Sequence, residues 1–157
     1  MTRGWSEAAL GTVLRWRAPD TEVSASQSYN YAGVYSHAGG VFRKHSVPGS
    51  SFAYERLTRL RMNEFVYPKL MAWEGALGVV PQNCDGCFVS PEFQVFDVDS
   101  EKLLPQFLDF YMRRPRVWSE LSRLSSGTNL RRRRLNAPEF LRYRISIPPL
   151  AEQQDLV

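Results

Sequence analysis

Helical periodicity is confined to a short part of this sequence, and this restriction is what most limits the fold. Apolar residues between positions 104 and 111 recur at intervals of three and four, which places them on one face of a helix. Pro115 begins a second segment of the same kind, and Gly127 is placed to end it. Upstream, residues 29–35 alternate with the period of a strand. The order of strands, two helices and a final strand predicts a single mixed α+β domain, with helices packed on a twisted, mostly antiparallel sheet.

The other elements have weaker local signals. A short helix is expected at residues 6–14, and another at 137–141 with Asn136 and Glu139 as its capping box. Residues 36–40 predict a loop, and residues 42–54 predict a turn-rich stretch. Strands are expected at 29–35, 64–67, 76–80, 88–89, 93–98 and 143–147. The prolines at 148 and 149 end the last strand, so the domain is predicted to span 1–147, with a separate helix beginning within 148–157.

Size and composition indicate a compact intracellular domain. The chain has 157 residues, of which 43% are hydrophobic, enough for one core. No apolar run approaches the roughly 18–20 residues that a membrane span needs. The first residues carry no sustained apolar segment, so a secretory signal is not expected. We therefore expect a cytoplasmic protein that does not contact membranes.

The two cysteines, Cys84 and Cys87, have the spacing of half a zinc site. Tetrahedral zinc needs four ligands, and the sequence has no second pair of this kind, while His37 and His45 are remote. The pair is better interpreted as flanking a two-residue hairpin turn, Asp85-Gly86, between short strands. No metal is expected.

Positive charge is concentrated in one segment. Residues 113–144 contain ten arginines against two glutamates, a local charge of +8, whereas the net charge of the whole chain is +4. Segregated charge creates a local field that favours a polyanionic partner. All ten are arginine, whose planar fork binds phosphates and guanine edges in a bidentate manner. Nucleic acid is the first hypothesis for the partner.

The sequence lacks the common catalytic patterns of nucleic-acid enzymes. A nuclease often ends its metal site in Asp/Glu-x-Lys, but the residues two positions before the three lysines are Phe42, Tyr67 and Ser100. The catalytic tetrapeptide of methyltransferases (Asn/Asp-Pro-Pro-aromatic) is missing, and the glycines at 75 and 78 are not followed by the Lys-Ser/Thr of a phosphate loop. We therefore expect a non-catalytic protein without a cofactor.

Four segments resemble one protein family. They are VYPKLMAWEGALGVV at 66–80, DGCFVSPEF at 85–93, SGTNLRRRRL at 126–135 and ISIPPLAEQQ at 145–154. In this order and spacing they resemble the target-recognition domain of the specificity subunits of type I restriction–modification systems. The resemblance covers residues 60–157 well and residues 1–59 more loosely.

The resemblance implies a function and a set of partners. Such a subunit carries two recognition domains, each reading one half of a split sequence in double-stranded DNA. Helices between the domains hold the methyltransferase (modification) subunits, and a separate motor-nuclease (restriction) subunit cuts. This chain corresponds to one recognition domain and ends at Val157, where the spacer helix is expected to begin, so it is expected to be a fragment or a half-subunit. Two alternatives stay open: the recognition domain of a fused restriction–methyltransferase enzyme, and a module that binds an acidic protein surface.

The candidate DNA-binding residues fall in loops and in the arginine run. Loops around 35–44 and 69–75 are expected to read base edges in the major groove, while arginines fix the register on the backbone. Thr128 and Asn129 precede the run and could donate to phosphates. The full set is Tyr35, His37, Arg43, Lys44, Lys69, Trp73, Glu74, Thr128, Asn129, Arg131, Arg132, Arg133 and Arg134.

Two further residues are assigned to a partner protein. The resemblance implies that the helix after the diproline contacts the methyltransferase, so Glu152 and Gln153 are expected on its subunit-facing side. The rigid diproline is expected to set the angle at which this helix leaves the domain.

Overall fold

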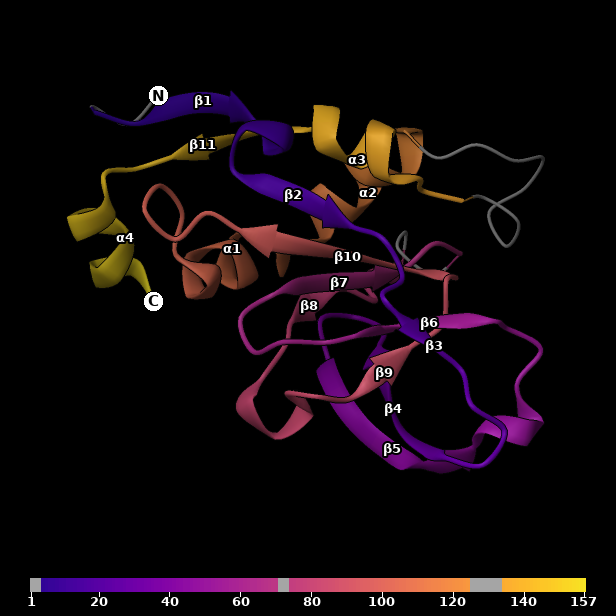
Figure 1. The fold of residues 1–157 in the computed structure, drawn as a ribbon. Coiled ribbons are helices and arrows are strands. Elements are labelled where there is room, and N and C mark those ends of the chain that lie inside the picture. The colour runs from indigo at the N-terminus through magenta and orange to yellow at the C-terminus, as the bar shows by residue number, and fades with distance from the viewer. Residues whose placement is uncertain (1–3, 71–73, 125–133) are drawn as a thin grey trace.

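The computed structural model describes residues 4–70, 74–124 and 134–157 (Figure 1). The strands in these ranges are β1 (Ser6–Ala9), β2 (Leu14–Arg17), β3 (Thr21–Glu22), β4 (Ser28–Tyr35), β5 (Gly40–Pro48), β6 (Arg56–Arg59), β7 (Phe65–Pro68), β8 (Gly78–Val79), β9 (Phe88–Val89), β10 (Phe93–Val98) and β11 (Arg144–Ile147). The α-helices are α1 (Pro105–Met112), α2 (Pro115–Leu124), α3 (Ala137–Arg142) and α4 (Leu150–Leu156). Within the same ranges, no helix is long and apolar enough to cross a membrane.

The strands form three sheets that are mostly antiparallel. The largest has the order β3-β6-β9-β4-β5, the second has the order β2-β10-β7-β8, and β1 pairs with β11. Among the described pairings, only that of β4 with β9 is parallel. Figure 1 shows the four-stranded sheet lying between the five-stranded sheet on one side and β1, β11 and α3 on the other. The predicted mixed α+β class is confirmed.

Both faces of β7 are buried, and each face contributes to a different hydrophobic core. Phe65 packs with Phe96 of β10 and Phe140 of α3 in the larger core, under the helices. The rings of Phe65 and Phe140 are nearly parallel, with their centroids 5.6 Å apart. Val66 points the other way, because successive side chains of a strand alternate, and it packs with Val95 in the smaller core. The four-stranded sheet therefore joins the helical layer to the five-stranded sheet.

Most of the expected elements are confirmed. The alternation at 29–35 is β4, and the strands expected near 64–67, 88–89, 93–98 and 143–147 are β7, β9, β10 and β11. The strand expected at 76–80 is shorter, since β8 covers only Gly78–Val79. Helices α1 and α2 lie where the apolar spacing predicts them, and α3 lies where a short helix is expected after Asn136. The apolar face of α1 is buried, as Phe107, Leu108 and Tyr111 are all in the larger core.

The helix expected at residues 6–14 is wrong. Residues 6–9 form β1, which pairs with β11 in the register Ser6↔Ile147 and Ala9↔Arg144, and a 3-10 helix, Leu10–Thr12, follows. Leu10 is fully buried, and its N–H donates to the carbonyl of Tyr143 at 2.8 Å. The backbone groups of this segment are satisfied by the distant C-terminal strand, and this long-range pairing overrides the weak local helical pattern.

Two other expectations need correction. The turn-rich stretch at 42–54 begins with a nine-residue strand, β5, which forms a long antiparallel hairpin with β4. Four consecutive polar residues in its middle, Arg43 to Ser46, are all exposed, so the strand has no alternating apolar pattern. The capping box at α3 is also wrong, since Asn136 is the N-cap residue but its side chain makes no capping hydrogen bond.

The segment with the two cysteines is a turn, but it does not join two paired strands. The N–H of Cys87 donates to the carbonyl of Cys84 at 3.0 Å, with Gly86 at φ 85° in the left-handed region that glycine favours. A 3-10 helix, Gln82–Cys84, precedes the turn and β9 follows it. Both thiols are free and buried in the smaller core, where burial raises the pKa of the Cys84 thiol.

Candidate nucleic-acid interface

The turn between β4 and β5 is held in a conformation that its residues do not favour. His37 and Ala38 have φ values of 58° and 55°, and the N–H of Gly39 donates to the carbonyl of Ser36 at 3.2 Å. A left-handed residue other than glycine costs about 1 kcal/mol or more and persists only where neighbouring structure imposes it. A second segment of the chain must therefore stabilise this turn.

That second segment is Glu74-Gly75. The N–H of His37 donates to the carbonyl of Glu74 at 2.8 Å, and the N–H of Ala38 donates to the carbonyl of Gly75 at 2.9 Å. The hydroxyl of Ser36 donates to Oε2 of Glu74 at 2.9 Å. Three hydrogen bonds thus join two loops that the sequence suggested separately as DNA-reading segments. One oxygen of the Glu74 carboxylate is engaged within the domain.

Helix α2 supports the two joined loops through a contact with Gly75. Gly75 has φ 74° and lies against the indole of Trp118, where a Cβ atom would overlap the ring. The indole is itself fixed, because its Nε1 donates to the carbonyl of Met112 at 2.7 Å. Trp118 is buried in the larger core. A chain of contacts therefore runs from the buried face of α2 to the exposed turn.

The turn presents an imidazole and an aromatic ring to solvent. Tyr35 is 54% exposed and stacks on Phe42 of β5, with ring centroids 3.9 Å apart. Phe42 lies over Gly33, where any side chain would collide with its ring. His37 is exposed, as are Arg43 and Lys44 on β5. Of the candidates expected in a loop around 35–44, Tyr35 and His37 are exposed beside the turn, but Arg43 and Lys44 lie on a strand and not in a loop.

The other described candidates lie at the end of β7. The N–H of Lys69 donates to the carbonyl of Glu92 at 2.9 Å, and the carbonyl of Lys69 accepts from the N–H of Leu135 at 3.0 Å. Arg134 is thereby brought beside Lys69, and its Nη1 lies 2.6 Å from Oε2 of Glu92. Both side chains of this ion pair are nearly half exposed. Lys69 and Arg134 are thus neighbours in space although they are far apart in sequence.

The arginine-rich segment does not form a single free cationic face in the described part of the chain. Arg113 pairs with Asp109 at 2.8 Å, and Arg116 lies 3.7 Å from Glu120. Arg114 lies over the ring of Tyr111, 5.2 Å from its centroid. These helical arginines, like Arg134, have partners within the domain, so the concentrated charge in the sequence overstates the charge that is free. Trp73, Thr128, Asn129, Arg131, Arg132 and Arg133 lie outside the described residues.

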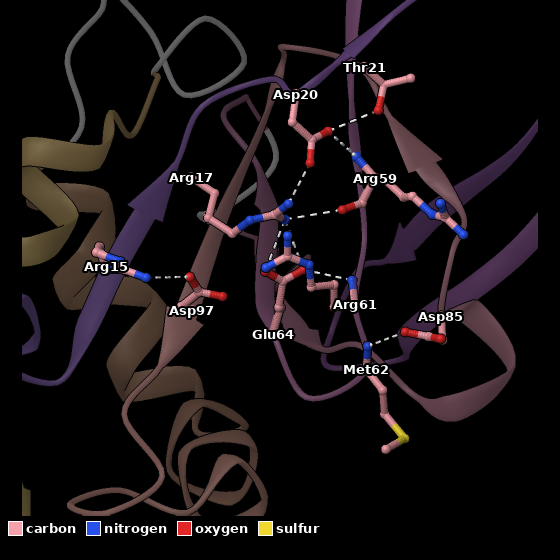
Figure 2. Close-up of polar contacts among 10 residues, drawn as sticks. All are labelled: Arg15, Arg17, Asp20, Thr21, Arg59, Arg61, Met62, Glu64, Asp85 and Asp97. Atoms are coloured by element: carbon pink, nitrogen blue, oxygen red, sulfur yellow. Dashed lines mark hydrogen bonds and ion pairs between the residues drawn. The ribbon is translucent and has the colours of Figure 1, made fainter.

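An ionic network that was not expected from the sequence joins the two large sheets (Figure 2). Nη1 of Arg17, at the end of β2, lies 2.9 Å from Oε2 of Glu64 and donates to the carbonyl of Arg59 on β6 at 3.1 Å. Its Nη2 donates to Asp20 at 2.6 Å, and Asp20 in turn accepts from the N–H of Arg59. One guanidinium therefore connects β2, the loop before β3, β6 and the loop before β7. Contacts this distant in sequence leave no local pattern.

Glu64 is the most perturbed carboxyl of this network. Burial raises its pKa to about 7, and the neighbouring carboxyl of Asp97 adds to the rise. The N–H of Arg61, which donates to Glu64 at 2.6 Å, and the charge of Arg17 act in the opposite direction. The Arg17–Glu64 pair at its centre is largely buried and the network links two sheets, so we assign it to the framework behind the interface and not to the interface.

Gln153 does not face a partner, contrary to the sequence-based expectation. Its side chain is fully buried and makes three hydrogen bonds within the domain. Its neighbour Glu152 is partly buried. Helix α4 does begin directly after the diproline, as expected.

Comparison with solved structures defines the class of fold. The fold is similar to that of one target-recognition domain in the HsdS subunits of type I R-M systems. The HsdS subunit from Thermoanaerobacter tengcongensis matches with a TM-score of 0.77 over 98% of this chain, at 20% sequence identity. A chain from a structure describing the complex assembly and conformational transition of the type I R-M system matches with a TM-score of 0.78 over 99% of this chain, at 21% identity.

The chain spans 40% of the length of each of these two structures. At this level of identity the comparison defines the fold. No protein-family model and no curated protein sequence matches the chain.

Proposed function

We propose that this chain recognises a specific sequence in double-stranded DNA as all or part of the specificity subunit of a type I restriction–modification system. The observation that carries the proposal is the strained turn at 36–39, which Glu74 and Gly75 hold in place and which exposes Tyr35 and His37. Strain of this kind gathers at binding sites, where a fixed conformation lowers the entropy cost of binding. The likeness of the fold to HsdS supports the proposal.

In this mechanism the β4–β5 hairpin reads base edges. The major groove of B-DNA admits a two-stranded β-ribbon, and an imidazole and a phenol at its tip can exchange hydrogen bonds with bases. Lys69, Arg134 and the arginines at 131–133 contact phosphates and set the register. Arg43 and Lys44, exposed on the hairpin, extend the positive surface along the groove.

The domain itself carries out no chemistry in this proposal. Methylation is assigned to methyltransferase subunits that bind helices continuing from the recognition domain, and cleavage is assigned to a motor-nuclease subunit in the same complex. In the absence of these subunits and of the second half of a split target, the isolated domain should bind DNA weakly and with strong salt dependence.

Two experiments test the proposal. Methylome sequencing of cells with and without the intact gene should reveal a modified motif that disappears with the gene. Binding of the intact protein to that motif should weaken when the four arginines at 131–134 are changed to alanine, and the salt slope should fall by up to about 0.9 per lost phosphate contact. Changing the ion-paired Arg113 and Arg116 to alanine is the control for general loss of charge. Unchanged affinity and slope in the fourfold variant would contradict the role of the run, and an unchanged methylome would contradict the function.

A further inference from the structure

The side chain of Gln153 joins α4 to the segment that precedes α1. Its Oε1 accepts from the N–H of Leu104 at 2.8 Å, and its Nε2 donates to the carbonyls of Lys102 and Pro148 at 3.0 Å and 2.9 Å. The residue is fully buried. Both amide protons and the amide oxygen are thus used, which is the condition under which a buried amide is stable.

One of these bonds replaces a missing helix cap. Leu104 is the N-cap residue of α1, and its own side chain cannot accept a capping hydrogen bond. In a capping box the side chain of a residue in the first turn binds the N–H of the N-cap residue. Here Gln153 binds that N–H from another helix, so the start of α1 and the body of α4 stabilise each other.

Helix α4 needs such an anchor to have a defined direction. It has only seven residues, and a helix this short is not stable in water by itself. Gln153 is its one buried residue, while Leu150, Gln154 and Asp155 are exposed. The diproline restricts the chain before the helix, but a rigid entry does not determine how the helix then lies against the domain.

We infer that Gln153 is the positioning residue that fixes the direction in which α4 leaves the domain. The bond to Pro148 holds the amide against the start of the helix, and the bonds to Lys102 and Leu104 hold it against the domain. Loss of these bonds removes the side-chain hydrogen bonds that join α4 to the segment before α1, so the direction of the helix becomes more variable. That a fixed direction of α4 matters for DNA recognition rests on the proposed function. The hydrogen bonds of Gln153 do not depend on that function.

The test measures the direction of α4 without DNA. Spin labels are attached at two exposed positions, through Asp155→Cys in α4 and Ser46→Cys in β5. The two natural cysteines are buried. Pulsed EPR should give one narrow distance distribution for the parent chain. Gln153→Met keeps the volume of the side chain and removes its hydrogen bonds, so the distribution should broaden clearly, and Tm should fall by roughly 5–10 °C. Gln154→Met, the same change at the exposed neighbour, should alter neither.

The outcomes separate positioning from simple stabilisation. A lower Tm with an unchanged distance distribution would show that Gln153 only stabilises the domain, and would overturn the inference. If Gln153→Met fails to fold, hydrogen exchange on the unsubstituted chain decides, because the Leu104 amide is bonded to Gln153. This amide should exchange at least about 100-fold more slowly than an open amide, and an unprotected Leu104 would overturn the inference. Neither result depends on whether the chain binds DNA.

Discussion

Two arginine–glutamate pairs in this domain have nearly the same geometry and very different surroundings. Arg17 and Glu64 lie 2.9 Å apart, with side-chain exposures of 10% and 4%, whereas Arg134 and Glu92 lie 2.6 Å apart, with exposures of 45% and 43%. The side chains of the buried pair have little contact with water, so removing one member leaves the other charge poorly solvated. At the surface pair, water or a phosphate can replace either partner. Burial, and not distance, separates a framework contact from one available for binding.

The largest expected effect comes from breaking the buried pair. Arg17→Met should lower the free energy of unfolding by about 3 kcal/mol at pH 8, because the buried Glu64 carboxyl loses its counter-charge and must either stay charged without it or take up a proton. Arg134→Met is the matched change at the surface and should cost less than about 1 kcal/mol. Urea denaturation of both variants measures the difference, and equal losses would refute the contrast between the two pairs.

A smaller effect is expected from pH alone. The folded domain raises the pKa of Glu64 to about 7 from its ordinary value of 4.5, so between these values the folded state holds a proton that the unfolded chain has lost. Stabilisation from this group is therefore complete below the unfolded pKa and is lost as pH rises through the folded pKa. The free energy of unfolding should fall by roughly 1–2 kcal/mol between about pH 5.5 and about pH 8. Glu64→Gln should flatten this dependence in urea titrations, and an equally steep curve in that variant would exclude Glu64 as its source.

The smallest effect on stability is expected at the surface pair, where the readout is DNA binding. Glu92→Gln should change the free energy of unfolding by less than about 0.5 kcal/mol. It should release Arg134 for phosphate and steepen the salt slope of duplex binding by up to about 0.9. Asp109→Asn releases Arg113 in the same way and serves as the control at an ion pair of the helical layer. If both variants bind alike across a salt titration, Arg134 has no special place at the interface.

The parts of the fold that could be predicted are those in which one segment carries its own pattern. The aromatic alternation of β4 and the apolar spacing of α1 are local, and both elements lie where they were expected. β1 could not be found in this way, because it depends on β11, and Glu7 and Arg144 at their junction are 137 positions apart. For the same reason its local sequence suggested a helix.

In the candidate site too, features with a local sequence pattern could be predicted and contacts between distant residues could not. Exposure of Tyr35 and His37 followed from their place at the end of a strand. Two side-chain contacts of the site could not be predicted from the sequence. Ser36 binds Glu74 from 38 positions away, and Glu92 binds Arg134 from 42 positions away. The burial of Gln153 was missed because a glutamine among polar residues after a diproline has the composition of an exposed helix.

The left-handed turn at His37-Ala38 has a consequence for engineering. Its shape is imposed by Glu74 and Gly75, so the hairpin tip and the 74–75 segment form one structural unit. A graft of the tip alone into a related domain would lose the three hydrogen bonds that shape it and would relax to another conformation. Exchange of both segments together, with the tryptophan beneath them, is the smallest transplant that should carry its binding preference into a new host.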